Sequence, residues 1–164
     1  MNIKLNKSKD SVKVLLVGNN PIELGSILEK LNGVRGQKII TETAFDIQSI
    51  LERLGNFNAN FILIDDNIGR EKLLRTTGML SKNKKTKNIP ITILKNSNYH
   101  ESTTSSNILD YLLKQNLSGE SLYNTIKNTL RFRRTQKLLI EVYERRRGLF
   151  GRFSMGRSAL NLLS

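Results

Sequence analysis

The hydrophobic and polar positions of the chain form two alternating patterns. Short apolar runs rich in β-branched residues predict buried strands at residues 12–17, 38–44, 61–65, 89–94 and 108–113. Between them, apolar residues recur every three or four positions, which predicts helices at residues 21–31, 46–54, 70–81 and from 118 onward. The segment 96–107 is polar and low in complexity, and we interpret it as a loop with at most a short helix.

This alternation predicts an α/β protein with a parallel sheet covered by helices on both faces. Five strand–helix units in about 130 residues favour a flavodoxin-like three-layer sandwich with the strand order 2-1-3-4-5. In such sheets the binding crevice lies at the carboxyl ends of the strands. The residues expected there are Gly18–Asn19, Asp65–Asp66, Lys95–Asn96 and Lys114–Gln115.

Local signals support the starts of two helices. Asn20 stands before Pro21 as a plausible N-cap, and Ser118 stands at the start of the last helix. In the second helix the spacing predicts a core-facing side made of Ile47, Ile50, Leu51 and Leu54.

Composition narrows the possible chemistry. The chain has no cysteine, which excludes disulfides and thiolate metal sites, and its one histidine, His100, lies in a polar stretch where we expect it to be solvated. No apolar run approaches the roughly 18 residues of a membrane span, and no apolar core follows the lysines of the N-terminus. We therefore expect a cytoplasmic protein.

Four stretches at the strand ends carry a specific resemblance. They are KVLLVGNNP at 13–21, FILIDDNIG at 61–69, NIPITILKN at 88–96 and DYLLKQNLSGESL at 110–122. In this order, over residues 12–130, the sequence resembles the receiver domain of bacterial two-component response regulators. The resemblance implies a CheY-like fold and a role as a signalling module, not an enzyme.

By position, the resemblance places the phosphoacceptor at Asp65, the phosphate-pairing lysine at Lys114 and the aromatic switch residue at Tyr111. The sequence departs from the family elsewhere in the site. The two acids that hold Mg²⁺ correspond to Gly18 and Asn19, the Thr or Ser that contacts the phosphoryl group corresponds to Lys95, and the proline after the lysine is Gln115.

These departures predict that the metal site is lost. Phosphoryl transfer to a carboxylate gathers negative charge that Mg²⁺ normally neutralises through oxygen ligands. Gly18 has no side-chain ligand and Asn19 offers a neutral carbonyl, so only Asp65 and Asp66 remain anionic. We hypothesise that Lys95 and Lys114 both approach Asp65 and replace the metal charge. The alternative is that Lys95 points into solvent.

The positive charge of the chain is concentrated at its C-terminus. The formal net charge is +13, and residues 127–164 contribute ten Lys or Arg against two Glu. No Pro or Gly interrupts residues 125–147, which predicts one long helix with an apolar face. The bases expected to bind a partner are Arg131, Arg133, Arg134, Arg145, Arg146 and Arg147.

Three roles are open for this extension: self-association, docking on an acidic protein or an anionic membrane, and binding of nucleic acid. We divide the chain into an N-terminal tail at 1–11, a receiver-like domain at 12–130 and a basic helical extension at 131–164. The favoured function is a degenerate receiver that acts as a phosphorylation-independent interaction module. Its partners would be a homodimer mate and a signalling protein such as a histidine kinase. The alternatives are a working phosphoacceptor at Asp65 and a nucleic-acid-binding protein.

Overall fold

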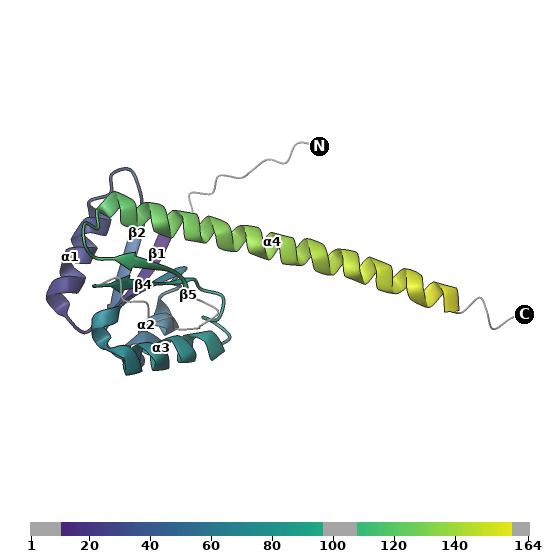
Figure 1. The fold of residues 1–164 in the computed structure, drawn as a ribbon, viewed down its shortest axis with the longest axis horizontal. Coiled ribbons are helices and arrows are strands. Elements are labelled where there is room, and N and C mark those ends of the chain that lie inside the picture. Colours follow the sequence, from purple (N-terminus) through teal and green to yellow (C-terminus); the bar gives the residue numbers. More distant parts are fainter. Residues whose placement is uncertain (1–10, 97–107, 159–164) are drawn as a thin grey trace, which may run out of the picture. The chain divides into compact units, whose positions relative to one another are not determined.

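A five-stranded parallel sheet forms the centre of the structure, a computed structural model that describes the backbone of residues 11–96 and 108–158 (Figure 1). The strand order is β2-β1-β3-β4-β5, so the predicted order is confirmed. The elements, in chain order, are β1 (Val12–Val17), α1 (Pro21–Asn32), β2 (Ile39–Ala44), α2 (Ile47–Asn56), β3 (Phe61–Asp65), the 3₁₀ turn η1 (Asp66–Ile68), α3 (Arg70–Lys82), β4 (Ile91–Lys95), β5 (Ile108–Leu113) and α4 (Gly119–Ser158).

The register of the strands brings their carboxyl ends level with one another. Val17 pairs with Ala44 on β2 and with Ile64 on β3, and Asp65 pairs with Leu94 on β4. The loops that follow β1, β3, β4 and β5 therefore meet at one edge of the sheet, where the sequence places the candidate site.

Helices cover both faces of the sheet (Figure 1). On one face, Ile50 of α2 and Leu73 and Leu80 of α3 join a buried cluster with side chains of β1, β3 and β4. On the other side, α1 buries Leu24, Ile27 and Leu31, and the first turns of α4 bury Leu122 and Ile126. This burial is the main force that holds the crevice in place, because the strands between the helices are almost wholly removed from water.

The start of α4 depends on a glycine. A Cβ atom at Gly119 would overlap the carbonyl oxygen of Lys30 at the end of α1, so only glycine allows this approach. Just before it, the Ser118 hydroxyl accepts a hydrogen bond from the Ser121 backbone N–H, at 3.1 Å, as expected of an N-cap.

Some details differ from the expectation. β4 begins at Ile91 rather than at residue 89, because the Ile89 N–H is used by a turn in a hydrogen bond to Thr86 and Pro90 has no N–H. In α2, Ile50 is buried, but Ile47 and Leu51 are 36% and 46% exposed. The face of α2 that contacts the sheet is narrower than the apolar face predicted from the sequence, so some of its apolar side chains remain exposed.

The chain divides into two compact units, Met1–Thr129 and Leu130–Ser164, which we call the sheet unit and the helical unit. α4 is a single helix of 40 residues that belongs to both. Every buried residue found in the described part of the chain lies in the sheet unit. No helix among the described residues has both the length and the apolarity needed to cross a bilayer.

Candidate functional site

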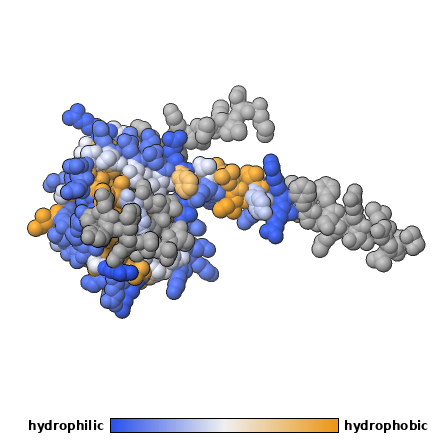
Figure 2. Space-filling model, viewed as in Figure 1, coloured by the Kyte–Doolittle hydropathy of each residue, from blue (hydrophilic) through white to orange (hydrophobic). Residues whose placement is uncertain are grey.

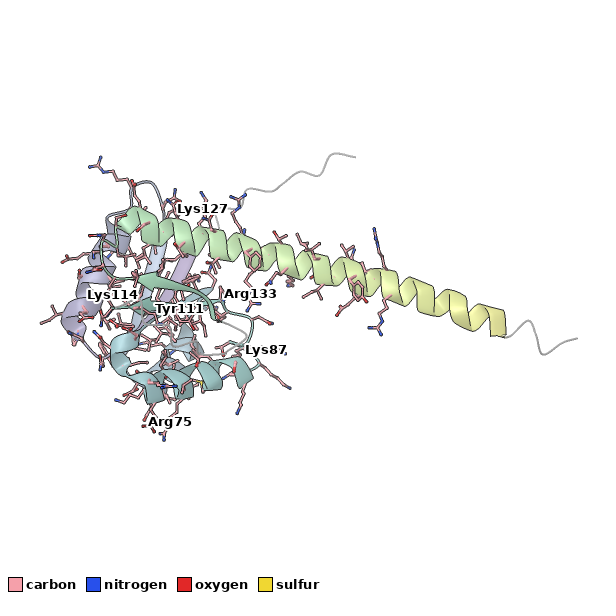
Figure 3. All side chains as sticks on the ribbon, in the orientation of Figure 1. Arg75, Lys87, Tyr111, Lys114, Lys127 and Arg133 are labelled. Carbon is pink, nitrogen blue, oxygen red and sulfur yellow. The ribbon has the colours of Figure 1, made fainter. Side chains whose placement is uncertain are left out.

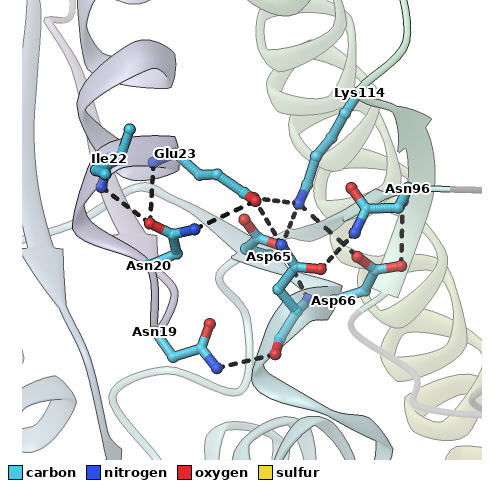
Figure 4. Close-up of polar contacts among 9 residues, drawn as sticks. Asn19, Asn20, Ile22, Glu23, Asp65, Asp66, Asn96 and Lys114 are labelled. Atoms are coloured by element: carbon cyan, nitrogen blue, oxygen red, sulfur yellow. Dashed lines mark hydrogen bonds and ion pairs between the residues drawn. The ribbon is translucent and has the colours of Figure 1, made fainter.

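Lys114, which is labelled in Figure 3, forms an ion pair with Asp65 at the carboxyl edge of the sheet (Figure 4). The Lys114 ammonium is 2.5 Å from Oδ1 of Asp65, and the Asp65 side chain is 1% exposed. Lys114 follows β5 directly, and its backbone N–H donates to the Lys95 carbonyl oxygen at 2.8 Å. The expectation that Asp65 and Lys114 are neighbours agrees with this geometry.

A second carboxylate, Glu23, shares the same ammonium. Its Oε2 lies 2.8 Å from the Lys114 Nζ, so Lys114 bridges Asp65 and Glu23. Oδ1 of Asp66 is farther away, at 4.0 Å. The Lys114 ammonium therefore lies among three carboxylates, from Asp65 on β3, Asp66 in η1 and Glu23 on α1.

Sequence reasoning missed Glu23, although a local signal was present. Asn20 caps α1 by accepting hydrogen bonds from the backbone N–H groups of Ile22 and Glu23, and its Nδ2 donates to Oε1 of Glu23 at 3.4 Å. The spacing Asn20-x-x-Glu23 is that of a capping box. A glutamate in the first turn of a helix that follows β1 begins at the crevice edge, so its carboxylate can reach the site.

Asn67 connects the loops around this ion pair. Its Nδ2 donates to Oε2 of Glu23 at 2.7 Å and its backbone N–H donates to Oδ1 of Asp65 at 2.9 Å. Its carbonyl oxygen accepts from Nδ2 of Asn19 at 2.9 Å, and its Oδ1 accepts from Nδ2 of Asn96. A carboxamide both donates and accepts, so Asn67 can bind the Glu23 carboxylate and the neutral side chain of Asn96 at the same time.

The charges of the three central groups affect one another. Burial raises the pKa of Asp65, and the hydrogen bond from Lys114 opposes that rise. The hydrogen bond from Lys114 lowers the pKa of Glu23. Burial disfavours the ammonium form of Lys114, but the hydrogen bonds to Asp65 and Glu23 outweigh it and raise the pKa of Lys114. The ammonium form of Lys114 is thus fixed by its two acids.

The Glu23→Gln variant should lose stability at neutral pH but not in acid. Because folding lowers the pKa of Glu23, its contribution is present above the ordinary value of 4.5 and disappears as the pH falls through the folded-state pKa. The pair is partly exposed, so we expect a cost of about 1 kcal/mol at about pH 7, falling to near zero at about pH 3. Urea unfolding of both proteins across this range measures it. A difference that does not change with pH would show that the carboxylate charge is not responsible.

Gly18 leaves space that other side chains fill. A Cβ atom at Gly18 would lie 2.6 Å from Cδ2 of Leu24 and 3.3 Å from Cβ of Asp65. Leu24 is 2% exposed and is held between α1 and the sheet. The end of β1 is thus built for close packing against Leu24 and Asp65, which leaves no room for a side chain at this position.

The Gly18→Ala variant should therefore destabilise the protein by about 1–3 kcal/mol, because Leu24 must move within a packed core. Gly25→Ala is the matched control, since a Cβ atom at Gly25 in α1 would meet nothing within 4 Å. Alanine there should be neutral or stabilising by up to about 1 kcal/mol. Thermal and urea unfolding compare the two. Equal effects of both substitutions would contradict the packing argument.

Lys95 lies away from Asp65, which corrects the hypothesis of two lysines around that carboxylate. Its ammonium is 4.8 Å from the centroid of the Tyr111 ring. Of the lysines and arginines whose side chains the structure describes, only Lys114 has its charged group within 4.0 Å of the Asp65 carboxylate.

The register explains this placement. Asp65 pairs with Leu94, whereas Lys95 pairs with Leu113 one residue farther along. Successive residues of a strand point to opposite faces, so Lys95 points away from the face of Asp65 and toward that of Tyr111. Lys114 follows Leu113 and returns to the face of Asp65.

The arginines of the extension lie on α4. Arg133 donates to Oε1 of Gln136 at 3.5 Å, and Arg131, Arg134 and Arg145–Arg147 have exposed side chains. Their predicted role in partner binding stays a prediction. His100 lies outside the described residues. Within the described part of the chain, no group of three or more His, Asp or Glu residues could hold a metal ion.

Comparison with known proteins gives a consistent result for the fold. No protein-family model matches the sequence, and neither does any curated protein. Solved structures do match. A chemotaxis response regulator of Vibrio cholerae is similar with a TM-score of 0.60 and 19% identity, over 73% of this chain and 98% of that one.

Two further structures come from Pseudomonas species. The signal receiver domain of an HD-domain protein from Pseudomonas fluorescens gives a TM-score of 0.63 at 12% identity, over 76% of this chain and 98% of that one. The receiver domain of a Pseudomonas aeruginosa sensor histidine kinase, which has a magnesium ion in its active-site cleft, gives 0.61 at 17% identity, over 73% and 98%. The chain therefore has the CheY-like fold of response regulator receiver domains.

Proposed function

We propose that the protein is a signalling module of the two-component type whose crevice works without phosphoryl transfer and without Mg²⁺. One observation carries the proposal: the Lys114 ammonium is already paired with Asp65 and with Glu23. The Lys114 ammonium thus neutralises part of the negative charge that a metal ion would otherwise balance. The receiver fold supports the signalling role, and no catalytic activity is proposed.

The residues at the crevice fit Mg²⁺ poorly. Gly18 supplies no side-chain oxygen, and a side chain there would collide with Leu24. The buried atoms Oδ2 of Asp65 and Oδ1 of Asp66 have no hydrogen-bond partner, so they are the available ligands. A divalent ion between them would lie close to the Lys114 ammonium, which is 4.0 Å from that Asp66 oxygen, and the two cations would repel each other.

A phosphoryl group on Asp65 would also be poorly balanced. The acyl phosphate would carry about two negative charges in place of the single charge of the Asp65 carboxylate, next to the Glu23 carboxylate. Among the described side chains, Lys114 is the one cation paired with both acids. Lys95, at the position of the family's Thr or Ser, lies over the Tyr111 ring. We propose that this contact holds the aromatic residue in one position.

Incubation with acetyl phosphate and Mg²⁺, followed by intact-mass measurement, tests the proposal. We expect no phosphoryl adduct, whereas a receiver domain with both metal-binding acids serves as the positive control. A stoichiometric adduct that is absent from the Asp65→Asn variant would establish the alternative, a working phosphoacceptor that uses the free Oδ2 of Asp65.

The partners that we propose for this chain bind through the helical unit. We propose that the chain self-associates through the exposed apolar side chains of α4 and that its arginines contact an acidic signalling protein, such as a histidine kinase. A nucleic-acid partner would instead show as a DNA affinity that falls steeply with salt concentration.

A further inference from the structure

The helical unit exposes large apolar side chains in its described part. Leu138, Leu139, Ile140 and Tyr143 are 60%, 65%, 57% and 65% exposed, and Phe132 and Val142 are 54% and 49% exposed. Figure 2 shows this apolar surface gathered along α4. Leu139, Ile140, Val142 and Tyr143 line one shallow hollow. An isolated helix of this kind is only marginally stable in water, so we expect its apolar surface to be buried against another molecule or segment.

The spacing of the apolar residues indicates which kind of partner buries this surface. Phe132, Thr135, Leu139 and Val142 follow one another at intervals of three, four and three residues, which is the a/d spacing of a heptad. Along the sequence the same spacing continues through Arg146 to Leu149 and Phe153. A repeat of 3.5 residues keeps one stripe facing a second helix that winds around the first.

We infer that α4 of one copy pairs with α4 of a second copy as a parallel, in-register two-stranded coiled coil, with Phe132, Thr135, Leu139 and Val142 in the seam. This inference rests on the self-association proposed above. It adds the seam, the orientation and the register.

The residues that flank the seam favour the parallel orientation. In a parallel pair each g residue faces the e residue five positions later on the partner, so Arg131 meets Gln136 and Leu138 meets Tyr143. The first contact is between a charged and a neutral side chain, and the second is apolar. In an antiparallel pair the g residues face one another, which sets Arg131 opposite Arg145 and brings like charges together.

The outer face of the helix is suited to water. Glu141 has Lys137 four residues before it and Arg145 four residues after it, a spacing at which opposite charges attract along a helix. The two acids of the segment, Glu141 and Glu144, lie at c and f, away from the seam. The same face also carries Arg133, Arg134, Lys137 and Arg147, so the choice of a second copy rests on the heptad spacing rather than on the charge pattern.

Two residues give the pairing distinctive properties. Arg146 is at an a position, where two arginines would meet in the parallel dimer and weaken it. Ile140 is at b, outside the seam, and nothing in the structure explains its exposure. The pair Leu139 and Ile140 is useful, because both are apolar and similarly exposed but only Leu139 belongs to the seam.

Matched glutamate variants of the full chain test the seam. Sedimentation equilibrium should show that Leu139→Glu weakens the dimer at least about 100-fold, since two carboxylates would be forced into an apolar layer. Ile140→Glu should leave the dissociation constant within about threefold of the parent, and Arg146→Leu should strengthen the dimer about tenfold. Equal weakening by both glutamates would overturn the inference and indicate a nonspecific apolar contact. A parent chain that is monomeric yet binds phosphatidylserine vesicles would also overturn it.

The absence of cysteine allows a clean test of orientation. Under mild oxidation, Leu139→Cys and Val142→Cys should each form disulfide-linked dimers, whereas the outward control Glu141→Cys should not. A mixture of Phe132→Cys and Val142→Cys that cross-links only as the heterodimer would show antiparallel pairing and overturn the inference. These results are separate from the phosphoryl-transfer test, so the register can fail while the proposed crevice function stands.

Discussion

Replacing Lys114 by methionine should destabilise the protein by about 3–5 kcal/mol, the usual cost of removing one partner of a buried ion pair. Asp65 is 1% exposed and would keep a charge or take up a proton in an apolar setting. Glu23 would lose the same partner, and the two carboxylates would face each other. Urea unfolding at neutral pH measures the loss.

Two controls separate the missing charge from the missing contacts. The double variant Lys114→Met/Asp65→Asn should recover most of the loss, because an amide needs no counter-ion. Lys87→Met, at an exposed lysine in the loop before β4, should change the free energy of unfolding by less than about 0.5 kcal/mol. If Lys114→Met costs no more than Lys87→Met, the ion pair does not hold the crevice together.

The Lys114→Met variant should also respond differently to pH. With the ammonium gone, burial dominates the Asp65 carboxyl and keeps its pKa above the ordinary value. A folded-state pKa that is raised for an acid means that the native state binds the proton more tightly than the unfolded chain does. The variant should therefore gain stability, relative to the parent, as the pH falls toward the range in which Asp65 is protonated.

The sequence was sufficient to predict the sheet and the central ion pair. Val12–Val17 is an apolar run of strand length broken only by Lys13, and Phe61–Asp65 is apolar up to its final aspartate, a pattern typical of buried parallel strands. The parallel sheet brings the ends of β3 and β5 to the same edge, and it was the resemblance to receiver domains that predicted Asp65 and Lys114 as neighbours there.

The rest of the site depends on side-chain direction, which a residue's position near a strand end does not fix. Lys95 ends β4 one residue beyond the partner of Asp65, and that single step turns it to the other face, over Tyr111. Glu23 belongs to a helix rather than a strand, and its approach to Lys114 depends on the N-cap at Asn20. The tight fit around Gly18 depends on Leu24, whose position follows from helix packing.

Asn67 shows a further limit of pattern reasoning. Its four contacts join the loop after β1, the helix α1, the end of β3 and the loop after β4. None of these contacts follows from periodicity, because Asn67 lies in the short turn η1. Asn19 and Asn96, after β1 and β4, were visible in the sequence, but their hydrogen bonds to Asn67 appear only when the loops are folded.

Truncation after Phe132 should leave a folded sheet unit and convert a dimer into a monomer. The buried residues of α4 are Leu122, Ile126 and Thr129, and all three are retained. The five strands and their helices are complete by that point, so the truncated chain keeps its core. The removed part carries Leu138, Leu139, Val142 and Tyr143, whose exposed surface is the proposed contact. Without this segment, α4 lacks the apolar surface through which we propose that the chain dimerises.

Sedimentation equilibrium of both chains at roughly 50 μM tests whether the removed segment is the dimer contact. A chain that is monomeric at this concentration has a dimer dissociation constant above roughly 50 μM. Circular dichroism should show a cooperative transition for both, since the truncated chain retains the buried core. The full-length Leu139→Glu variant is the control that keeps chain length and net helix content. A full-length chain that is monomeric, or a truncated chain that still dimerises, would remove self-association from the role of this helix. Docking of its arginines on an acidic partner would then be the function to test.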